Sequence, residues 1–325
     1  MTKKIVVFAC GGTGVNIGNM LERQDTTADA KAAAIEVCYI DTSEANVRDY
    51  DIKPEQMYIF EGIDGSGSDR TKNSDAISDA SKDVLQNFST GDLHIVIHSM
   101  GGGSGSVIGP ALASQLLAEG KQVIVMAVQT TAMIKHLKNT VAVFKTFEAI
   151  AKKRKRVLPI LLVSNDHESE SNVDRTVTGA ISMLSLLFSG NVNRLDSADL
   201  EHWLNFNKVT SFAHGTALLD ITTEAKEMHK GDSICAVATI AQNPNVATQY
   251  SSDIEYQTVG YISTLESEEF AKKALHFVLI DGPIKRAFDA CDLREKEAEK
   301  AITSRKSRAV IEVADDEADD NGLVY

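Results

Sequence analysis

The sequence predicts an α/β fold in which a covered parallel sheet is followed by a smaller α+β region. Continuous apolar stretches alternate with helical stretches through the first half of the chain, as expected when the strands of a parallel sheet are buried on both faces. Residues 207–281 carry further strand and helix candidates, which make up the smaller region. The chain has 325 residues, of which 43% are hydrophobic, so it can bury two cores of ordinary size.

The strands of the first half are predicted at short apolar stretches that are rich in β-branched residues. They lie at residues 5–9, 35–40, 57–60, 93–97, 123–128 and 157–163. Helices are predicted at 15–23, at about 71–88, at 106–119 and in a stretch that ends in the basic residues 152–156. Ligands of such sheets bind beyond the carboxyl ends of the strands, so a site is expected in the loops that follow them.

The smaller region is predicted to contain strands at 209–212, 233–241, 254–262 and 276–280, with helices near 221–230 and 267–275. Gly282 and Pro283 then begin a highly charged helix that is expected to reach about residue 308. The last residues, 309–325, contain six acidic and no basic side chains and end in Leu323, Val324 and Tyr325. A tail that only keeps the protein solvated has no need of an apolar end. We therefore expect this segment to make a contact with a partner.

The strand at 93–97 leads into a glycine-rich loop that we expect to bind phosphate. In residues 101–105, only Ser104 carries a Cβ atom. Several backbone N–H groups of such a loop can point into one concavity, and the following helix adds the positive end of its dipole. An isolated glycine run is also typical of a flexible turn. Its position between a buried strand and a long helix favours the anion site.

Glycine-containing loops at 10–14, 65–68 and 101–105 are expected to meet at the carboxyl edge of the sheet. The sequence contains no GxxxxGK[ST] motif, which excludes a P-loop NTPase. Gly103 lies in the middle of the third loop, where a bulky side chain would fill the phosphate concavity.

Two other enzyme classes fit parts of this pattern. Gly12, Gly14 and Gly18 form a GxGxxxG turn, and Asp41 at the end of the second strand is placed to meet a ribose, as in NAD(P)-dependent oxidoreductases. That alternative leaves the loop at 101–105 unexplained. Ser104 suggests a serine hydrolase, but GxSxG requires glycine where Ser106 stands, so this class ranks third.

Charge and composition limit the partners. The formal net charge of −13 argues against nucleic acid as a partner, because phosphate neutralisation requires a basic surface. No stretch has the length of a membrane span and the N-terminal apolar stretch is too short for a signal peptide, so we expect a cytoplasmic protein without a membrane partner. The cysteines are far apart, and the histidines lack metal-ligand spacing. We therefore expect buried, reduced thiols and no protein-bound metal site.

Three motifs taken together resemble the tubulin/FtsZ superfamily. Residues 11–18 (GGTGVNIG) resemble the first nucleotide loop of tubulins, and residues 101–106 (GGGSGS) resemble their signature loop. Residues 193–200 (NRLDSADL) are similar to the catalytic loop of FtsZ-type proteins. The sequence departs from the family at Ser104, where threonine is usual, and at Val107, where another glycine often follows. The length and the acidic tail most resemble the bacteriophage tubulin-like (PhuZ) group.

This resemblance implies a domain organisation and a function. It implies a GTP-binding domain at 1–171, a central helix at 172–192, an activation or C-terminal α+β domain at 193–281, and a C-terminal helix with an acidic tail at 282–325. The apolar face expected for the central helix is Val177, Ala180, Ile181, Leu184, Leu187 and Phe188. The implied function is that of a cytoskeletal GTPase whose subunits polymerise head to tail, in the host bacterial cytoplasm if the chain is phage-encoded.

The resemblance also implies which residues bind GTP or GDP. They are Gly11, Gly12, Thr13, Gly14, Asn16, Gly65, Ser66, Gly67, Ser68, Gly101, Gly102, Gly103, Ser104, Gly105, Ser106, Asn165 and Asp174. Backbone N–H groups and the Ser104 and Ser106 hydroxyls would hold the phosphates, and residues 65–68 would close over the terminal phosphate. Asn16, Asn165 and Asp174 would meet ribose or base, with the Asp174 carboxylate favouring guanine. Mg²⁺ would bridge the phosphates, with no protein ligand assigned.

Asp196 and Asp199 are the residues expected to carry hydrolysis, by orienting a water and drawing its proton. The same pair is typical of a helix cap with an acid at the third position, and both roles can hold together. In the tubulin-like arrangement this loop lies far from its own nucleotide, so the adjacent subunit completes the site. The group also uses its tail to reach the next subunit. The basic residues expected to bind the acidic tail of the next subunit are Lys135, Lys138, Lys145 and residues 152–156.

Overall fold

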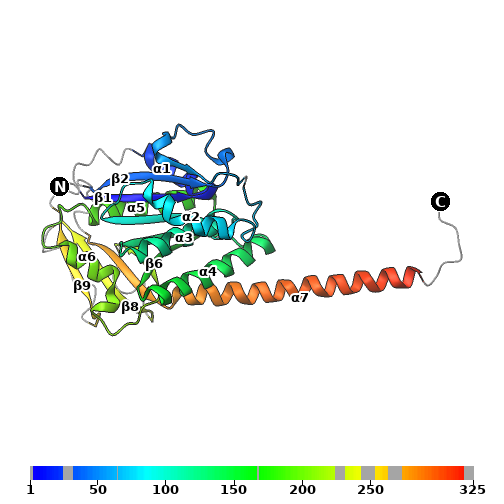
Figure 1. Cartoon of the computed structure of the whole chain (residues 1–325). Coiled ribbons are helices and arrows are strands. Elements are labelled where there is room, and N and C mark those ends of the chain that lie inside the picture. The colour runs from blue at the N-terminus through cyan, green and yellow to red at the C-terminus, as the bar shows by residue number, and fades with distance from the viewer. Residues whose placement is uncertain are drawn as a thin grey trace.

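The structure is a computed structural model that describes residues 3–24, 32–63, 65–166, 168–223, 231–242, 253–262 and 273–317 (Figure 1). The strands are β1 (Lys4–Cys10), β2 (Ala34–Asp41), β3 (Met57–Ile59), β4 (Leu93–Ser99), β5 (Val123–Gln129), β6 (Leu158–Ser164), β7 (Thr216–Thr222), β8 (Ser233–Ala241), β9 (Gln257–Tyr261) and β10 (Leu275–Asp281). The α-helices are α1 (Gly11–Arg23), α2 (Ser74–Gln86), α3 (Gly105–Ala118), α4 (Ile134–Arg154), α5 (Glu170–Leu187), α6 (Ser197–Leu204) and α7 (Pro283–Glu317).

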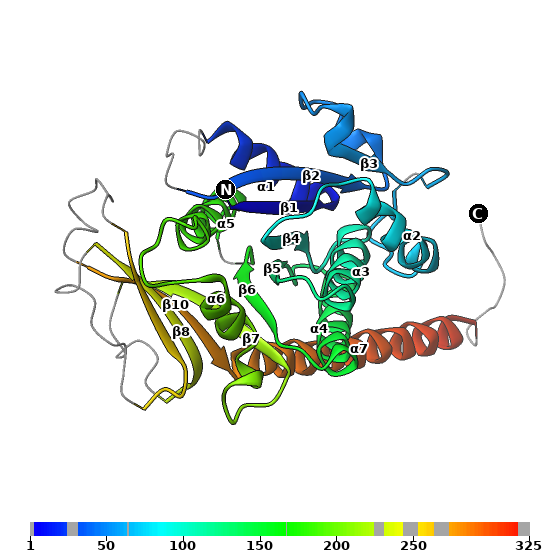
Figure 2. The same cartoon turned by 60° about the vertical axis from the view of Figure 1, so that its left-hand side comes forward.

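These strands form one sheet in the order β3-β2-β1-β4-β5-β6-β7-β10-β8-β9 (Figure 2). Neighbouring strands from β3 to β7 are parallel, which confirms the predicted parallel sheet of the first half. β10 pairs antiparallel with both β7 and β8. The smaller region therefore extends the same sheet, and β6 and β7 join the two halves.

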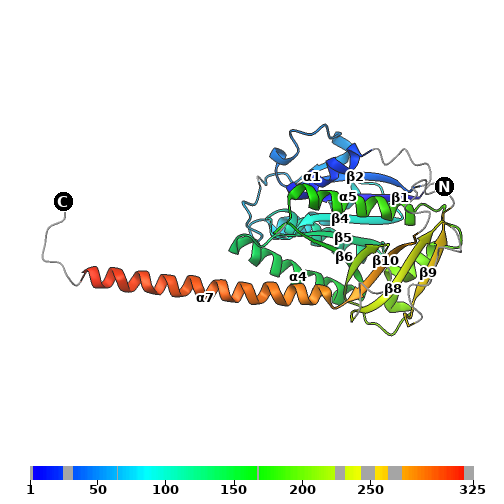
Figure 3. The same cartoon turned by 180° about the vertical axis from the view of Figure 1, so that it is seen from behind.

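Helices cover both faces of the parallel half. α1 and α5 lie on one face, and α2, α3 and α4 lie on the other, with α7 against α4 (Figures 1 and 3). In β1, Ile5 and Val7 belong to the core under α1 and α5, whereas Val6 and Phe8 belong to the core under α3 and α4, and all four are at most 1% exposed. Successive side chains of a strand point to opposite faces, so a strand covered on both sides is apolar throughout.

A helix, α5, is present where the sequence predicts the central helix. It begins at Glu170, two residues before the predicted 172–192 segment, because Ser169 caps it by accepting a hydrogen bond from the N–H of Asn172 at 3.3 Å. The predicted apolar face is at most 6% exposed throughout: Val177, Ala180, Ile181, Leu184, Leu187 and Phe188. That face packs towards α1 and β6, and the chain then continues to α6.

α7 is 35 residues long, and its far end stands clear of the rest of the molecule (Figure 1). The helix continues to Glu317, beyond the predicted end near 308, so it includes the first part of the predicted tail. Its near end packs on α4, where the rings of Phe144 and Phe288 meet edge to face. Residues 318–325 lie outside the described part of the chain.

The lysines of α4 are already engaged within the chain. Lys138 pairs with Glu299 of α7 at 2.6 Å, and Lys145 lies 3.7 Å from Asp292 of α7. Lys135 donates to the carbonyl oxygen of Gly67 at 2.9 Å. Contact of these cations with an acidic tail stays a prediction, and such a contact has to compete with α7 of the same chain for two of them.

The prediction of a strand at 209–212 is wrong. Residues 206–210 form a turn in which the N–H groups of Val209 and Thr210 both bind the carbonyl oxygen of Phe206, and the strand begins later, at Thr216. The predicted helix near 221–230 begins within β7 and otherwise falls mainly on residues 224–230, outside the described residues. The predicted helix near 267–275 falls mainly on residues up to 272, also outside them, and its last residue begins β10.

Two expectations from composition concern the interior and the membrane. All four cysteines are free and buried, which confirms the prediction of buried thiols. Burial raises the pKa of the Cys38 thiol to about 12, so this thiol stays protonated near neutral pH. None of the helices in the described ranges combines the length and the apolar character that crossing a bilayer requires.

Candidate functional site

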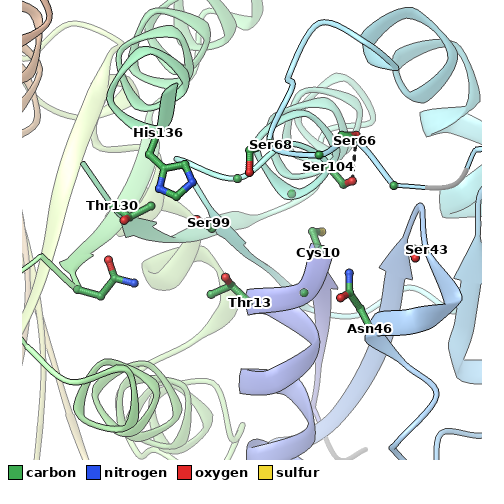
Figure 4. A pocket seen from close by; sticks show the side chains of 18 of the residues that line it. Cys10, Thr13, Ser43, Asn46, Ser66, Ser68, Ser99, Ser104, Thr130 and His136 are labelled. Atoms are coloured by element: carbon green, nitrogen blue, oxygen red, sulfur yellow. Dashed lines mark hydrogen bonds between the residues drawn. The ribbon is translucent and has the colours of Figure 1, made fainter. Parts of the chain in front are cut away.

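One pocket brings the three glycine loops together at the carboxyl ends of the parallel strands (Figure 4). Its volume is about 490 Å³. The lining residues are Cys10, Gly11, Gly12, Thr13, Ser43, Asn46, Gly65, Ser66, Gly67, Ser68, Ser99, Gly102, Gly103, Ser104, Gly105, Thr130, His136, Asn165 and Glu170. Most of them are glycines or carry hydroxyl or amide groups. The wall therefore offers hydrogen-bond donors at close range, which suits an anionic ligand.

Two long helices begin at this pocket, α1 at Gly11 and α3 at Gly105. No side chain caps either start, so the first N–H groups of each helix, which have no intrahelical acceptor, are left for a ligand. The two starts are in contact: a Cβ atom on Gly11 would lie 2.8 Å from Cα of Gly105. Only glycine permits this approach, which directs two sets of free N–H groups and two helix dipoles at one place.

The loop at 65–68 lies against the loop at 101–105. The Ser104 hydroxyl is 2.5 Å from that of Thr42 and 3.1 Å from that of Ser66. A Cβ atom on Gly103 would lie only 2.6 Å from Cβ of Ser66 and 3.1 Å from the backbone nitrogen of Ser68. The third loop is therefore packed so tightly against the second that a side chain at 103 has no room.

Asn139 of α4 orients both loops, and sequence reasoning missed it. Its amide nitrogen lies 2.9 Å from the carbonyl oxygen of Gly101, 3.1 Å from that of Gly102 and 3.0 Å from that of Ser68. These bonds hold the carbonyl groups away from the pocket and leave the N–H groups for a ligand. The available signal was an amide one helical turn before the apolar Val143 in a predicted helix.

Five predicted binding residues do not line the pocket: Gly14, Asn16, Gly101, Ser106 and Asp174. Gly14 serves close packing, because a Cβ atom there would lie 2.7 Å from the carbonyl carbon of Ala9. The Ser106 hydroxyl is buried and donates to the carbonyl oxygen of Gly103 at 2.8 Å, so it stabilises the loop itself. The side-chain amide oxygen (Oδ1) of Asn16 accepts from the Tyr50 hydroxyl at 2.7 Å, outside the pocket wall.

Two polar atoms at the pocket lack a partner within the part of the chain that the structure describes. They are Nδ1 of His136 and Oδ1 of Asn165, and both are buried. Figure 4 shows the His136 ring facing the pocket beside Thr130. Buried polar atoms are normally hydrogen-bonded, so this pair indicates that a polar ligand completes the site.

Asp196 and Asp199 lie at the start of α6, where the expected cap is confirmed. Asp196 Oδ1 accepts from the N–H groups of Ala198 at 2.8 Å and Asp199 at 3.0 Å, and Asp199 Oδ2 accepts from the N–H of Asp196 at 2.9 Å. The N–H groups of Asp199 and Ala198 lower the pKa of Asp196. Each aspartate uses one carboxylate oxygen in the cap and keeps the other for different contacts.

The capped start of α6 and the glycine-lined pocket lie at opposite ends of the sheet. Lys3, which precedes β1, bonds Ser197 at the start of α6 at 2.8 Å. At its other end β1 reaches the pocket, at Cys10. A strand of seven residues spans roughly 20 Å, so the two carboxylates do not reach a ligand in the pocket of their own chain.

Residues 4–171 match the family described as "Tubulin/FtsZ family, GTPase domain". This chain belongs to the Tubulin/FtsZ family. Residues 195–281 match "Phage tubulin-like protein, C-terminal domain". A phage tubulin-like protein of Pseudomonas phage PhiPA3 is 27% identical over 99% of each chain.

Solved structures of phage tubulins have the same fold as this member of the Tubulin/FtsZ family. The TubZ protofilament from bacteriophage PhiKZ matches with a TM-score of 0.80 and 25% identity over 93% of this chain and 92% of that one. A GDP complex of the phage tubulin PhuZ matches with a TM-score of 0.80 and 21% identity over 92% of each chain, which shows the fold. The resemblance to the bacteriophage tubulin-like group is thereby confirmed.

Family membership does not support the oxidoreductase alternative, and Asp41 supplies a physical reason. The Asp41 carboxylate is fully buried, with the N–H of Thr42 at 2.6 Å and the amide of Asn46 at 2.7 Å. Burial raises the pKa of Asp41 although these bonds act in the opposite direction. A carboxylate engaged in its own loop is not free to bind a ribose.

Several residues of the tubulin-like pocket were not predicted from the sequence. They are Cys10, Ser43, Asn46, Ser99, Thr130, His136 and Glu170. Most directly follow or end a parallel strand, as Ser43 does after β2, Ser99 in β4 and Thr130 after β5. The rule that ligands bind beyond the carboxyl ends of the strands would have selected these three positions.

Proposed function

We propose that this chain binds GTP in the glycine-lined pocket, assembles head to tail into filaments, and hydrolyses GTP with Asp196 and Asp199 of the adjacent subunit. One observation carries the proposal: the pocket and the two carboxylates lie at opposite ends of one sheet. A second copy stacked along the sheet would bring its carboxylates to the nucleotide of the first. Hydrolysis would then depend on assembly. Because the relatives are proteins of bacteriophages, we assign this activity to the cytoplasm of the host bacterium.

The pocket fits a nucleoside di- or triphosphate. The uncapped starts of α1 and α3 supply the N–H groups for the phosphates, and the absence of a side chain at Gly103 lets the loop at 65–68 pack directly against the third loop. GDP is the nucleotide named for one solved relative. Within the described residues, no cluster of three or more His, Cys, Asp or Glu side chains is placed to hold a metal ion. We therefore assign Mg²⁺ to the phosphates.

Asp174 is the residue we assign to guanine. Its carboxyl is half-buried on α5, and burial together with the carboxylate of Glu170 raises its pKa. No donor in the described part of the chain offsets this burial, so a ligand that donates two N–H groups would stabilise the ionised form. Guanine presents such a pair, from its ring N–H and exocyclic amine, whereas adenine does not.

Asp174→Ala is expected to lower affinity for GTP by roughly 10-fold to 100-fold and to leave weak ATP binding unchanged, because hydrogen bonds to a charged group contribute about 1.5–3 kcal/mol. Competition binding of GTP and ATP measures the change in preference. Thr176→Ala is the matched control, since Thr176 is exposed on the same helix and does not line the pocket. Equal affinity of the unmodified chain for GTP and ATP would contradict the assignment of Asp174 to guanine recognition.

The assembly step is tested by sedimentation and negative-stain microscopy of the full chain with GTP, GDP, ATP or no nucleotide. We expect filaments with GTP and none with ATP or without nucleotide. The rate of phosphate release should rise steeply with protein concentration, because each site is completed by a second subunit. A rate per subunit that is constant across concentrations, with no filaments, would contradict the proposal.

The C-terminal tail is assigned to assembly. The described part of the chain ends with α7, whose far end lies away from the body of the molecule, in a position to reach a neighbouring subunit (Figure 3). The acidic residues are followed by the apolar end at Leu323 to Tyr325. Exposed ion pairs contribute only about 0–1 kcal/mol each, so we expect the tail to act through several pairs together with burial of its apolar end.

Deleting residues 312–325 is expected to raise the critical concentration for assembly severalfold while thermal unfolding and GTP affinity of the monomer stay unchanged. High salt should weaken assembly of the full chain in the same direction, because it screens exposed charges. Replacing only Leu323, Val324 and Tyr325 with serine is the matched control for the apolar end. Equal critical concentrations of the full and shortened chains across a salt series would show that the tail is only a solvated terminus.

A further inference from the structure

The loop that carries Asp196 and Asp199 is held from the side of β9. Asn193 and Tyr261 exchange two backbone hydrogen bonds, of 2.8 Å and 2.9 Å. The Tyr256 hydroxyl donates to the carbonyl oxygen of Asp199 at 3.0 Å. These contacts fix the loop within the second half of the chain. They hold it to β1 and the pocket only through the strands that lie between β9 and β1 in the sheet.

Lys3 supplies a second attachment. Its ammonium group donates to Oδ1 of Asp92 at 2.9 Å and to the hydroxyl of Ser197 at 2.8 Å. Oδ2 of Asp92 accepts from the N–H of Lys4 at 2.9 Å, so this carboxylate is fixed at the end of β1. The stem of Lys3 also covers Gly190, where a Cβ atom would lie 3.0 Å from Cγ of Lys3. One side chain thus holds the segment leading to α6 at two points.

The hydrogen bond from Lys3 to Ser197 fixes the position of α6 and is not part of the cap of that helix. Ser197 stands between the two aspartates, but the cap is made by Asp196 and Asp199 themselves. Loss of the Lys3 bond would therefore leave α6 intact and free the start of the helix to shift against β1. β1 begins at Lys4, next to Lys3, and ends at the phosphate loop, so this attachment connects the start of α6 to the strand that leads to the pocket.

We propose that Lys3 is a positioning residue for hydrolysis: together with Asp92 it fixes the start of α6 on the end of β1, so that Asp196 and Asp199 meet the nucleotide of the neighbouring subunit in the productive orientation. The proposal rests on the function proposed above. It assigns no contact between Lys3 and the nucleotide. Displacement of a reacting group by about 1 Å can lower a rate up to about 100-fold, which is the scale of effect expected here.

The test compares Lys3→Met, which keeps most of the stem and removes the ammonium, with Lys3→Arg, which keeps two directed donors. Ser197→Ala removes only the acceptor on α6 and leaves the ion pair with Asp92 in place. Lys4→Met is the matched control, because Lys4 binds Glu36 and Ser89 at the same end of the sheet and makes no contact with α6. GTP affinity, critical concentration and phosphate release per polymerised subunit are measured for each full-length variant.

We expect Lys3→Met and Ser197→Ala to lower phosphate release per polymerised subunit by about tenfold or more, with GTP affinity unchanged. Lys3→Arg should restore most of the rate, and Lys4→Met should keep it. In mixed filaments, subunits with Gly103→Trp, which supply an intact loop but bind no nucleotide, should rescue Lys3→Met subunits. The double variant Lys3→Met, Gly103→Trp should not rescue them.

An equal loss of rate in Lys3→Met and Lys4→Met, or an unchanged rate in Ser197→Ala, would overturn the proposal. Where Lys3→Met fails to fold, Ser197→Ala decides alone, since it leaves the ion pair in place. Asp199→Ala separates this outcome from a failure of the proposed function. If Asp199→Ala loses turnover while Ser197→Ala keeps it, only the role of Lys3 is wrong. Full turnover in Asp199→Ala would instead contradict the assignment of Asp199 to hydrolysis.

Discussion

Gly103→Trp is expected to abolish nucleotide binding, with affinity for GTP and GDP falling by more than about 1,000-fold, or roughly 4 kcal/mol. A Cβ atom at this position would already lie 2.6 Å from Cβ of Ser66, so the indole has to enter the pocket or expel the loop at 65–68. Either result removes the phosphate site. Titration calorimetry with both nucleotides measures the loss, and thermal unfolding of the monomer checks that the fold persists.

Gly102 and Gly103 provide a matched pair for this prediction. A Cβ atom on Gly102 would have Cβ of Ser99 as its nearest neighbour, at 3.9 Å, which is ordinary contact. Gly102→Ala should therefore lower affinity much less than Gly103→Ala, although both residues line the same pocket. Equal losses for the two alanine variants, or retained binding in Gly103→Trp, would show that the tight packing of the two loops is not what shapes the phosphate site.

The phosphate loops could be predicted from the sequence because their signal is local. A buried strand, a glycine run and a long helix are contiguous in the chain, and their order alone directs N–H groups at the carboxyl edge of the sheet. The same holds for β1, where the apolar run from Ile5 to Ala9 follows from burial on both faces. The cap at Asp196 and Asp199 is local as well, since it depends on residues three apart.

The rest of the site depends on contacts between distant segments. Asn139 binds three carbonyl groups of two other loops, and a sequence pattern shows only a polar residue within a helix. Asp41 fits a ribose-binding position by sequence, whereas the fold buries its carboxylate against Asn46. The bond between Lys3 and Ser197 joins residues 194 positions apart. Such pairings follow from the register of the sheet, which local patterns do not specify.

Asp199→Ala is expected to keep GTP affinity and to lose most hydrolysis, by about 100-fold or more, so that its filaments persist longer than those of the unmodified chain. The substitution removes a carboxylate that can orient water, and it lies at the other end of the sheet from the phosphate loops. Phosphate release and light scattering after a GTP pulse measure both effects. Asp199→Asn separates chemistry from the cap, because its amide oxygen can still accept from the N–H of Asp196.

A mixing experiment decides whether Asp199 acts on its own nucleotide or on that of a neighbour. Subunits with Gly103→Trp cannot hold nucleotide but carry an intact Asp199, and they should restore turnover when mixed with Asp199→Ala subunits that hold GTP. Subunits with both substitutions should restore none. Rescue can arise only where the carboxylate of one copy meets the nucleotide of another. Normal turnover in Asp199→Ala alone would instead show that this carboxylate takes no part in hydrolysis, and that opposite placement of pocket and loop has another purpose.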